Sequence, residues 1–204
     1  MSLLPIEFEK LTEKHGAWAS WAIWEYEKSR IGEKSTDIIY SNIEALNVRN
    51  VIIGLNISNG VEVWGNFRGG KHDRKLKYAF NDTAIRGAYM TDLFRIKMKE
   101  STSLAKELKI NPELIPENVL RFVDEMRDLK ITSETRFILM GTEESVLGKY
   151  YRREFQKYFK DNPVTYHRHY SSRGTDKTWV ESMRESLNIN GNFDEILLKY
   201  KVKD

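Results

Sequence analysis

The chain has 204 residues, of which 40% are hydrophobic and 12% aromatic, so it can build one sizeable core and is not a disordered chain. It contains no cysteine, which excludes disulfides, thiolate nucleophiles and cysteine metal sites. Its formal net charge of +3 is too small to identify a nucleic-acid-binding protein by itself.

No change of composition divides the chain. We therefore expect a single domain over residues 1–204, with residues 1–46 as an N-terminal helical extension packed on it. The first residues include Glu7, Glu9 and Lys10 and lack the long apolar stretch of a signal peptide. No window approaches the run of roughly 20 apolar residues that crosses a bilayer. We expect no membrane association and a cytoplasmic location.

The N-terminal part of the chain is rich in tryptophan. Residues 7–30 predict a helix, because Trp18, Trp21 and Trp24 recur at a spacing that gives one broad apolar face. Such a stripe normally packs in a core, although a tryptophan cluster can also stack on bases. The following residues 38–46 are compatible with a strand, a helix or an extended loop.

The clearest strand covers residues 48–53, which are mostly β-branched or apolar and end at Gly54, as is typical of a buried strand in a parallel sheet. The glycine-rich and aromatic segment 58–71 predicts an ordered loop, a kind of segment that often carries function. Residues 74–80 predict a short helix. Residues 87–93 predict a second buried strand that ends in polar residues.

The second half of the chain repeats an alternation of helix and strand. Apolar spacing predicts helices over residues 119–129 and 142–155 and a last helix around residues 179–187. Strands are predicted over residues 136–141 and 164–169. The whole pattern predicts an α/β fold, a three-layer α/β/α sandwich with a central, mostly parallel sheet of about four strands.

Polar residues stand where these strands end, and the carboxyl ends of the strands are where parallel α/β sheets bind ligands. They are Asn56 after the first strand, Asp92 at the end of the second, Thr142 and Glu143 after the third, and His169 to Ser172 after the fourth. If neighbouring strands carry them, Asn56 and His169 face one crevice.

Two of these strand ends carry a family resemblance. The segment Val51 to Gly60, V-I-I-G-L-N-I-S-N-G, resembles the first motif of the uracil-DNA glycosylase superfamily, whose closest variants read Gly-x-Asn-Pro. His169-Tyr170-Ser171 occupies the place of its second motif, a His-Pro-Ser or similar triplet after the last strand. The resemblance extends over roughly three quarters of the chain, but Ile57 and Tyr170 stand where the family usually has proline.

The resemblance implies a DNA glycosylase that needs no metal and no organic cofactor. Asn56 would hold the attacking water, and His169 would donate a hydrogen bond to the departing base. Trp64 or Phe67 would stack on a base flipped out of DNA. The residues expected to hold phosphates or to insert beside the strand are Ser58, Ser171, Ser172 and Arg173.

Asp92 stands where the family commonly has an asparagine that reads the base. Uracil presents an N3–H donor and an O4 acceptor, and an asparagine satisfies both, whereas an ionised aspartate only accepts. Three alternatives follow from the sequence: Asp92 is protonated, it does not read the base, or the preferred base is not uracil.

Other functions are compatible with the same fold. The chain is alternatively a catalytically inactive module that binds nucleic acid or a nucleotide, with activity lost through Ile57, Tyr170 and Asp92. A different α/β hydrolase is a third reading. The sequence has no cysteine, no Gly-x-Ser-x-Gly elbow, no phosphate-binding Gly-x-x-x-x-Gly-Lys-Ser/Thr loop and no Gly-x-Gly-x-x-Gly fingerprint, which speaks against its commonest forms.

Overall fold

A computed structural model describes residues 5–26, 35–57 and 62–200 of the protein. It is an α/β structure with a five-stranded sheet in the order β1-β3-β2-β4-β5. The strands are β1 (Ser20–Trp21), β2 (Asn47–Asn56), β3 (Ala88–Phe94), β4 (Arg136–Leu139) and β5 (Val164–Tyr166). All neighbouring pairs are parallel except β1 with β3. The predicted α/β class and mostly parallel sheet are confirmed, but the sheet has five strands where about four were expected.

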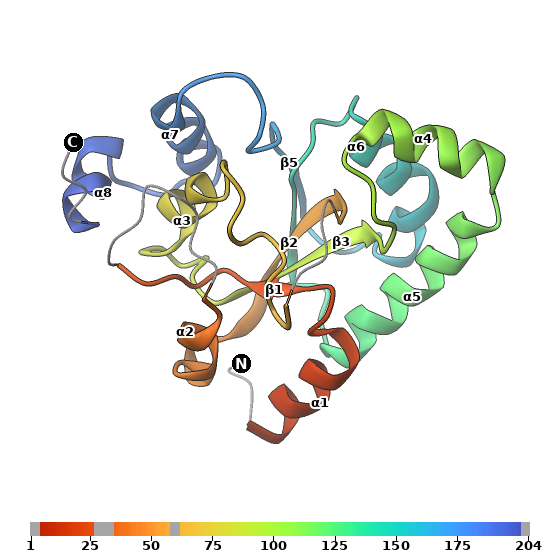
Figure 1. Ribbon diagram of the computed structural model, residues 1–204, viewed down its shortest axis with the longest axis horizontal. Helices are drawn as coiled ribbons and strands as arrows, with labels where there is room; N and C mark the ends of the chain where they lie inside the picture. The colour runs from red at the N-terminus through yellow and green to blue at the C-terminus, as the bar shows by residue number, and fades with distance from the viewer. Residues whose placement is uncertain (1–4, 27–34, 58–61, 201–204) are drawn as a thin grey trace.

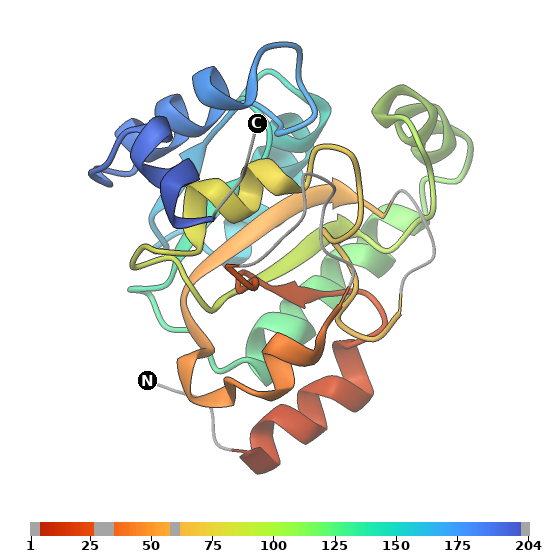
Figure 2. The ribbon, with the colours of Figure 1, turned by 60° about the vertical axis from the view of Figure 1, so that its left-hand side comes forward.

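Helices on either side of the sheet connect these strands (Figure 1). Figure 2 shows α3 close along β2, on the side that α7 and α8 also occupy. The α-helices in the described residues are α1 (Pro5–His15), α2 (Asp37–Tyr40), α3 (Arg74–Phe80), α4 (Ser101–Ile110), α5 (Leu114–Asp128), α6 (Val146–Tyr150), α7 (Asp176–Ser186) and α8 (Phe193–Lys199). Shorter turns are η1 (Ile43–Ala45), η2 (Tyr151–Phe155) and η3 (Gln156–Tyr158). None of the helices within the described ranges is both long and apolar enough to cross a membrane.

Strand β2 forms the centre of the sheet because its side chains are apolar on both faces. Val51 and Ile53 belong to one buried apolar cluster, and Ile52 between them belongs to a second one. Ile52 is paired with Met90 of β3 on one side and with Ile138 of β4 on the other. Burial on both faces explains why this strand is a continuous β-branched run rather than an alternating one.

The predicted helix over residues 7–30 is wrong from Gly16 to Tyr26, and residues 27–30 lie outside the described residues. The chain turns at Gly16, where a Cβ atom would lie 2.6 Å from the carbonyl oxygen of Thr12, and then forms the edge strand β1. Trp21 is fully buried in this strand. Part of the segment expected as a helical extension therefore belongs to the sheet. Spacing alone could not separate the two cases, because buried tryptophans fit a helix face and a covered strand equally well.

Several other boundaries differ from the prediction. Helices α4 and α8 were not predicted, because each buries only two side chains: Leu104 and Leu108 in α4, and Phe193 and Ile196 in α8. The strand predicted over 164–169 ends at Tyr166, so that His169 lies three residues beyond β5. Asn56, expected in a loop, is the last residue of β2.

The order of the strands fixes where a ligand crevice opens. Strands β2 and β4 are neighbours at the middle of the sheet. From β2 the chain continues to β3, toward one edge of the sheet, and from β4 it continues to β5, toward the opposite edge. Two adjacent parallel strands whose connections run in opposite directions leave a crevice at their carboxyl ends. The strand order thus places the carboxyl ends of β2 and β4 at the topological switch point.

Candidate active site

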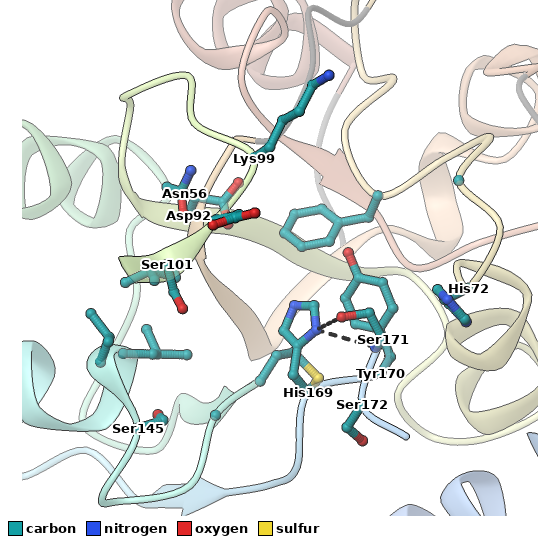
Figure 3. Close-up of a pocket in the computed structure, with 18 of the residues that line it drawn as sticks. Asn56, His72, Asp92, Lys99, Ser101, Ser145, His169, Tyr170, Ser171 and Ser172 are labelled. Atoms are coloured by element: carbon teal, nitrogen blue, oxygen red, sulfur yellow. Dashed lines mark hydrogen bonds between the residues drawn. The ribbon is translucent and has the colours of Figure 1, made fainter. Parts of the chain in front are cut away.

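A pocket of about 800 Å³ lies at this switch point. Its walls come from the end of β2, from Asp92 of β3, and from the segments 66–73, 98–102, 140–147 and 168–172. Figure 3 shows Asn56 and Asp92 on one side of the pocket, with His169 and Tyr170 rising from below. Residues more than a hundred positions apart in the chain therefore meet in one cavity.

Asn56 lines the pocket, and its side-chain amide nitrogen is already committed. Nδ2 donates hydrogen bonds to the carbonyl oxygens of Met98 at 2.7 Å, Ile57 at 3.2 Å and Ile96 at 3.3 Å. These contacts tie the end of β2 to the loop that follows β3. They also fix the amide so that Oδ1 is the group left for a ligand, since no hydrogen bond to it is present among the described residues.

His169 lines the opposite side of the pocket as a neutral ring with a defined tautomer. Its Nδ1 accepts a hydrogen bond from the backbone N–H of Ser171 at 3.1 Å and lies 2.7 Å from the Ser171 hydroxyl. Because Nδ1 accepts from an N–H, the ring proton resides on Nε2. Burial lowers the pKa of His169 to about 4, with the positive charges of His72 and Lys75 adding to the effect. His169 is therefore a hydrogen-bond donor at neutral pH.

Of the two aromatic candidates, only Phe67 belongs to the pocket. Its ring makes an edge contact with Tyr170, with the centroids 6.5 Å apart. Trp64 is fully buried in the core, where Nε1 donates to the hydroxyl of Thr12 at 3.1 Å and the ring contacts Trp21. The expectation that Trp64 contacts a base is thus wrong. Both aromatics have left-handed backbone angles, φ 60° at Trp64 and 61° at Phe67, which non-glycine residues rarely adopt.

The residues expected to contact phosphate fall into three groups. Ser171 and Ser172 line the pocket, although the backbone N–H and hydroxyl of Ser171 both serve to hold His169. Arg173 is exposed and does not line the pocket. Ser58 lies outside the described residues.

Asp92 lies in the wall of the pocket and is almost completely buried. Its Oδ2 accepts a hydrogen bond of 2.8 Å from Nδ2 of Asn66, and Arg121 donates to its backbone oxygen at 3.0 Å. Burial raises the pKa of Asp92 from 3.8 to about 7, against the lowering effects of the Asn66 hydrogen bond and the Arg121 charge. A carboxyl group with such a pKa changes its charge near neutral pH, as acid–base and recognition groups in functional sites often do.

Several pocket residues were not predicted from the sequence, of which Asn66 and Tyr170 matter most. Asn66 lies in the loop expected to carry function but had no motif to single it out. Tyr170 was noted only as a departure from the family pattern, yet its ring stacks on that of His169, with centroids 4.3 Å apart and 28° between the ring planes. The polar residues Lys99 to Thr102, which lead into α4, also line the pocket. Their run in the sequence was a signal that could have identified this part of the wall.

Gly54 permits this arrangement, because it pairs with Asp92 across β2 and β3. A Cβ atom on Gly54 would lie 2.1 Å from Oδ1 of Asp92 and 3.1 Å from the ring of Phe67. Gly54→Ala is therefore expected to displace the carboxyl group and to lower the free energy of unfolding by about 1–3 kcal/mol, as overpacking of a core does. Urea denaturation measures the change.

A double-mutant cycle provides the control for this prediction. In an Asp92→Ala background the nearest clash is absent, so adding Gly54→Ala should cost less than it does in the wild type. An equal cost in both backgrounds would show that the carboxyl group does not occupy the space above Gly54.

The chemistry available in this pocket is that of hydrogen-bonding and titratable side chains. Within the described ranges, no group of three or more His, Asp or Glu side chains is arranged to hold a metal ion. Comparison of the chain with models of protein families, with curated proteins and with solved structures found no match.

Proposed function

We propose that the protein is a DNA glycosylase-like enzyme that hydrolyses the N-glycosidic bond of uracil or another damaged base in DNA, without a metal or an organic cofactor. The observation that supports the proposal most is that Asn56, His169 and Phe67 line one pocket at the switch point of the sheet. The two apolar clusters on alternate residues of β2 support the three-layer α/β/α arrangement that the alternation of strands and helices predicts.

In this proposal His169 stabilises the leaving group. When the bond from C1′ of the sugar to the base breaks, its electron pair leaves with the base and negative charge develops on a base oxygen. The Nε2–H of His169 is a preorganised donor to that oxygen, since Ser171 fixes the ring from the other side. One such donor accounts for about 10²–10³ in rate at comparable sites.

Asn56 positions the water that replaces the base at C1′. Its Oδ1 accepts a hydrogen bond from the water, while the bonds from Nδ2 to Met98 and Ile96 keep the amide from turning. An amide is a poor base, so the water gains its reactivity mainly from the oxocarbenium character of the sugar. The water oxygen bonds to C1′ and gives up one proton to the solvent, and the base, which left with the electron pair of the broken bond, takes a proton from the solvent.

The rim of the pocket supplies positive charge for a nucleic-acid backbone. Lys71, Lys99 and Arg168 line the pocket and are exposed to solvent. Phosphate contacts of this kind position a nucleic acid without reading its sequence. They support DNA as the partner, with Phe67 as the aromatic contact for a flipped base.

The alternative is a binding module of the same fold that has lost catalysis. One observation favours it: Phe67 is only 7% exposed and its ring touches Tyr170, the residue that replaces the proline of the second motif. A base cannot stack on the covered part of Phe67 unless Tyr170 moves.

The test is to incubate the purified protein with oligonucleotides that contain uracil, hypoxanthine or a mismatch, and then to cleave abasic sites with alkali. We expect strand breaks at the damaged base in at least one oligonucleotide. The Asn56→Ala/His169→Ala double variant, purified in the same way, controls for contaminating glycosylases. Salt-dependent DNA binding without abasic sites on any oligonucleotide would replace the proposal with the binding module.

A further inference from the structure

Asn66 holds the carboxyl group of Asp92 in one orientation. Its Nδ2 donates to the carbonyl oxygen of Trp18 and to Oδ2 of Asp92, each at 2.8 Å, and its Oδ1 accepts the backbone N–H of Phe67 at 3.0 Å. Turning the amide over would bring its oxygen against the Trp18 carbonyl, which only accepts. Asn66 is therefore a donor to Asp92 and cannot be its acceptor.

The other carboxyl oxygen, Oδ1, faces a different environment. It lies over Gly54 beside the ring of Phe67, and among the described residues no donor or acceptor contacts it. Figure 3 shows the Asp92 carboxyl group directed into the pocket next to Asn56. Because Oδ2 already accepts from Asn66, a proton on the neutral acid belongs on Oδ1, where none of the described residues accepts it.

We propose that Asn66 is a positioning residue, and that it orients Asp92 so that the neutral acid donates a hydrogen bond from Oδ1 to a carbonyl oxygen of the bound base. The inference rests on the proposed function and narrows its substrate class to oxo-bases, such as uracil or hypoxanthine. A base that presents an amino group to Oδ1 is rejected, because the amino group and the protonated Oδ1 are both hydrogen-bond donors. An acid kept neutral by an apolar site so that it can donate is a known device of enzymes.

The charged and titratable groups around Asp92 come from three elements. Arg121 and Glu125 of α5 act in opposite directions on its charge, and they form an ion pair with each other at 2.7 Å. Tyr170, from the loop after β5, has a raised pKa, caused first by burial and then by the charges of Asp73 and Asp92, so it remains neutral. Lys99 is an exposed cation on the rim of the same pocket. Burial prevails over these charges and brings the pKa of Asp92 to about 7.

The proposal predicts how activity depends on pH. The fraction of neutral Asp92 falls as the pH rises through about 7, so the rate on a uracil oligonucleotide should fall about tenfold per pH unit above that point. His169 does not titrate there, because its pKa is about 4. Asp92→Asn places an amide in the same position, where it can donate at every pH, and should be active with a flat profile.

The experiment has two independent measurements. The first is a carbon-detected NMR titration of the Asp92 carboxyl, assigned by its absence in Asp92→Asn, in the wild type and in Asn66→Ala. We expect a midpoint near pH 7 in the wild type and an upward shift of about one pH unit in Asn66→Ala, because the variant lacks the bond that favours the ionised form. The second is the pH profile of uracil release by the wild type, Asp92→Asn and His72→Gln, which removes the other histidine in the wall of the pocket.

The outcomes separate the two proposals. A wild-type midpoint below about pH 5, or one that Asn66→Ala does not move, overturns the positioning role whether or not the protein is active. The expected titration with no base release from any oligonucleotide supports the positioning role and rejects the glycosylase. Base release with a pH profile that is flat in the wild type overturns the base-reading role of Asp92. If Asn66→Ala does not fold, the wild-type midpoint and the pH profile of Asp92→Asn still decide whether Asp92 acts as a neutral donor.

Discussion

Replacing His169 by alanine should slow the release of uracil from DNA by about 10²–10³-fold. The loss is expected in the chemical step, because Nε2–H is proposed to stabilise charge that exists only as the base departs. Substrate binding should change little, since the proposed phosphate contacts at the rim would supply most of it. Single-turnover rates with enzyme in excess over a uracil oligonucleotide measure the chemical step directly.

His72 offers a matched control for this experiment, since it is a second histidine in the wall of the same pocket. His72→Gln should keep most of the rate. An equal loss in His72→Gln and His169→Ala would mean that neither ring has a specific role. Activity that survives in both Asn56→Ala and His169→Ala would contradict the assignment of both residues.

The second large effect concerns stability. Asp92→Asn should make the protein more stable than the wild type as the pH rises. In the folded wild type the pKa of Asp92 is about 7, against an ordinary value of 3.8. Between these values the unfolded chain has lost the proton that the folded chain retains, so the free energy of unfolding falls as the pH increases. The fall reaches up to about 4 kcal/mol and stops above pH 7.

Urea denaturation at pH 5, 6, 7 and 8 measures this difference. The stability of Asp92→Asn relative to the wild type should grow steadily over the series and then level off. Asp124→Asn is the control, because Asp124 is an exposed carboxylate whose side chain is 63% accessible. A constant difference between Asp92→Asn and the wild type would show that Asp92 is ionised in the folded protein at every pH tested.

The parts of the fold that could be predicted from the sequence are those with a single dominant signal. Strands β2, β3 and β4 are short apolar runs, and burial on both faces makes such runs easy to recognise. Strand β1 was missed because Trp21, together with Trp18 and Trp24, also fits a helical face. Helix α4 was missed because its amphipathic pattern is weak and only Leu104 and Leu108 are buried.

The same distinction applies to the site. Asn56 and His169 were predicted because their position after strands follows from topology alone. The roles of Trp64 and Phe67 could not be separated, since both are aromatic residues of one loop and only packing decides which of them lines the pocket. The contact of Asn66 with Asp92 joins a loop to a strand 26 positions away, and only packing brings the two together.

Gly54 has a consequence for how this sequence can change over generations. The space above its Cα atom is filled by Asp92 Oδ1, and the oxygen on the other side of that carboxyl group is bound by Asn66. A mutation of Gly54 to a larger residue is therefore least costly together with a shorter side chain at position 92, which in turn leaves one N–H of the Asn66 amide without its acceptor. Chains descended from a common ancestor should keep or lose Gly54, Asn66 and Asp92 as a set, and a search for this covarying triplet is a way to find them.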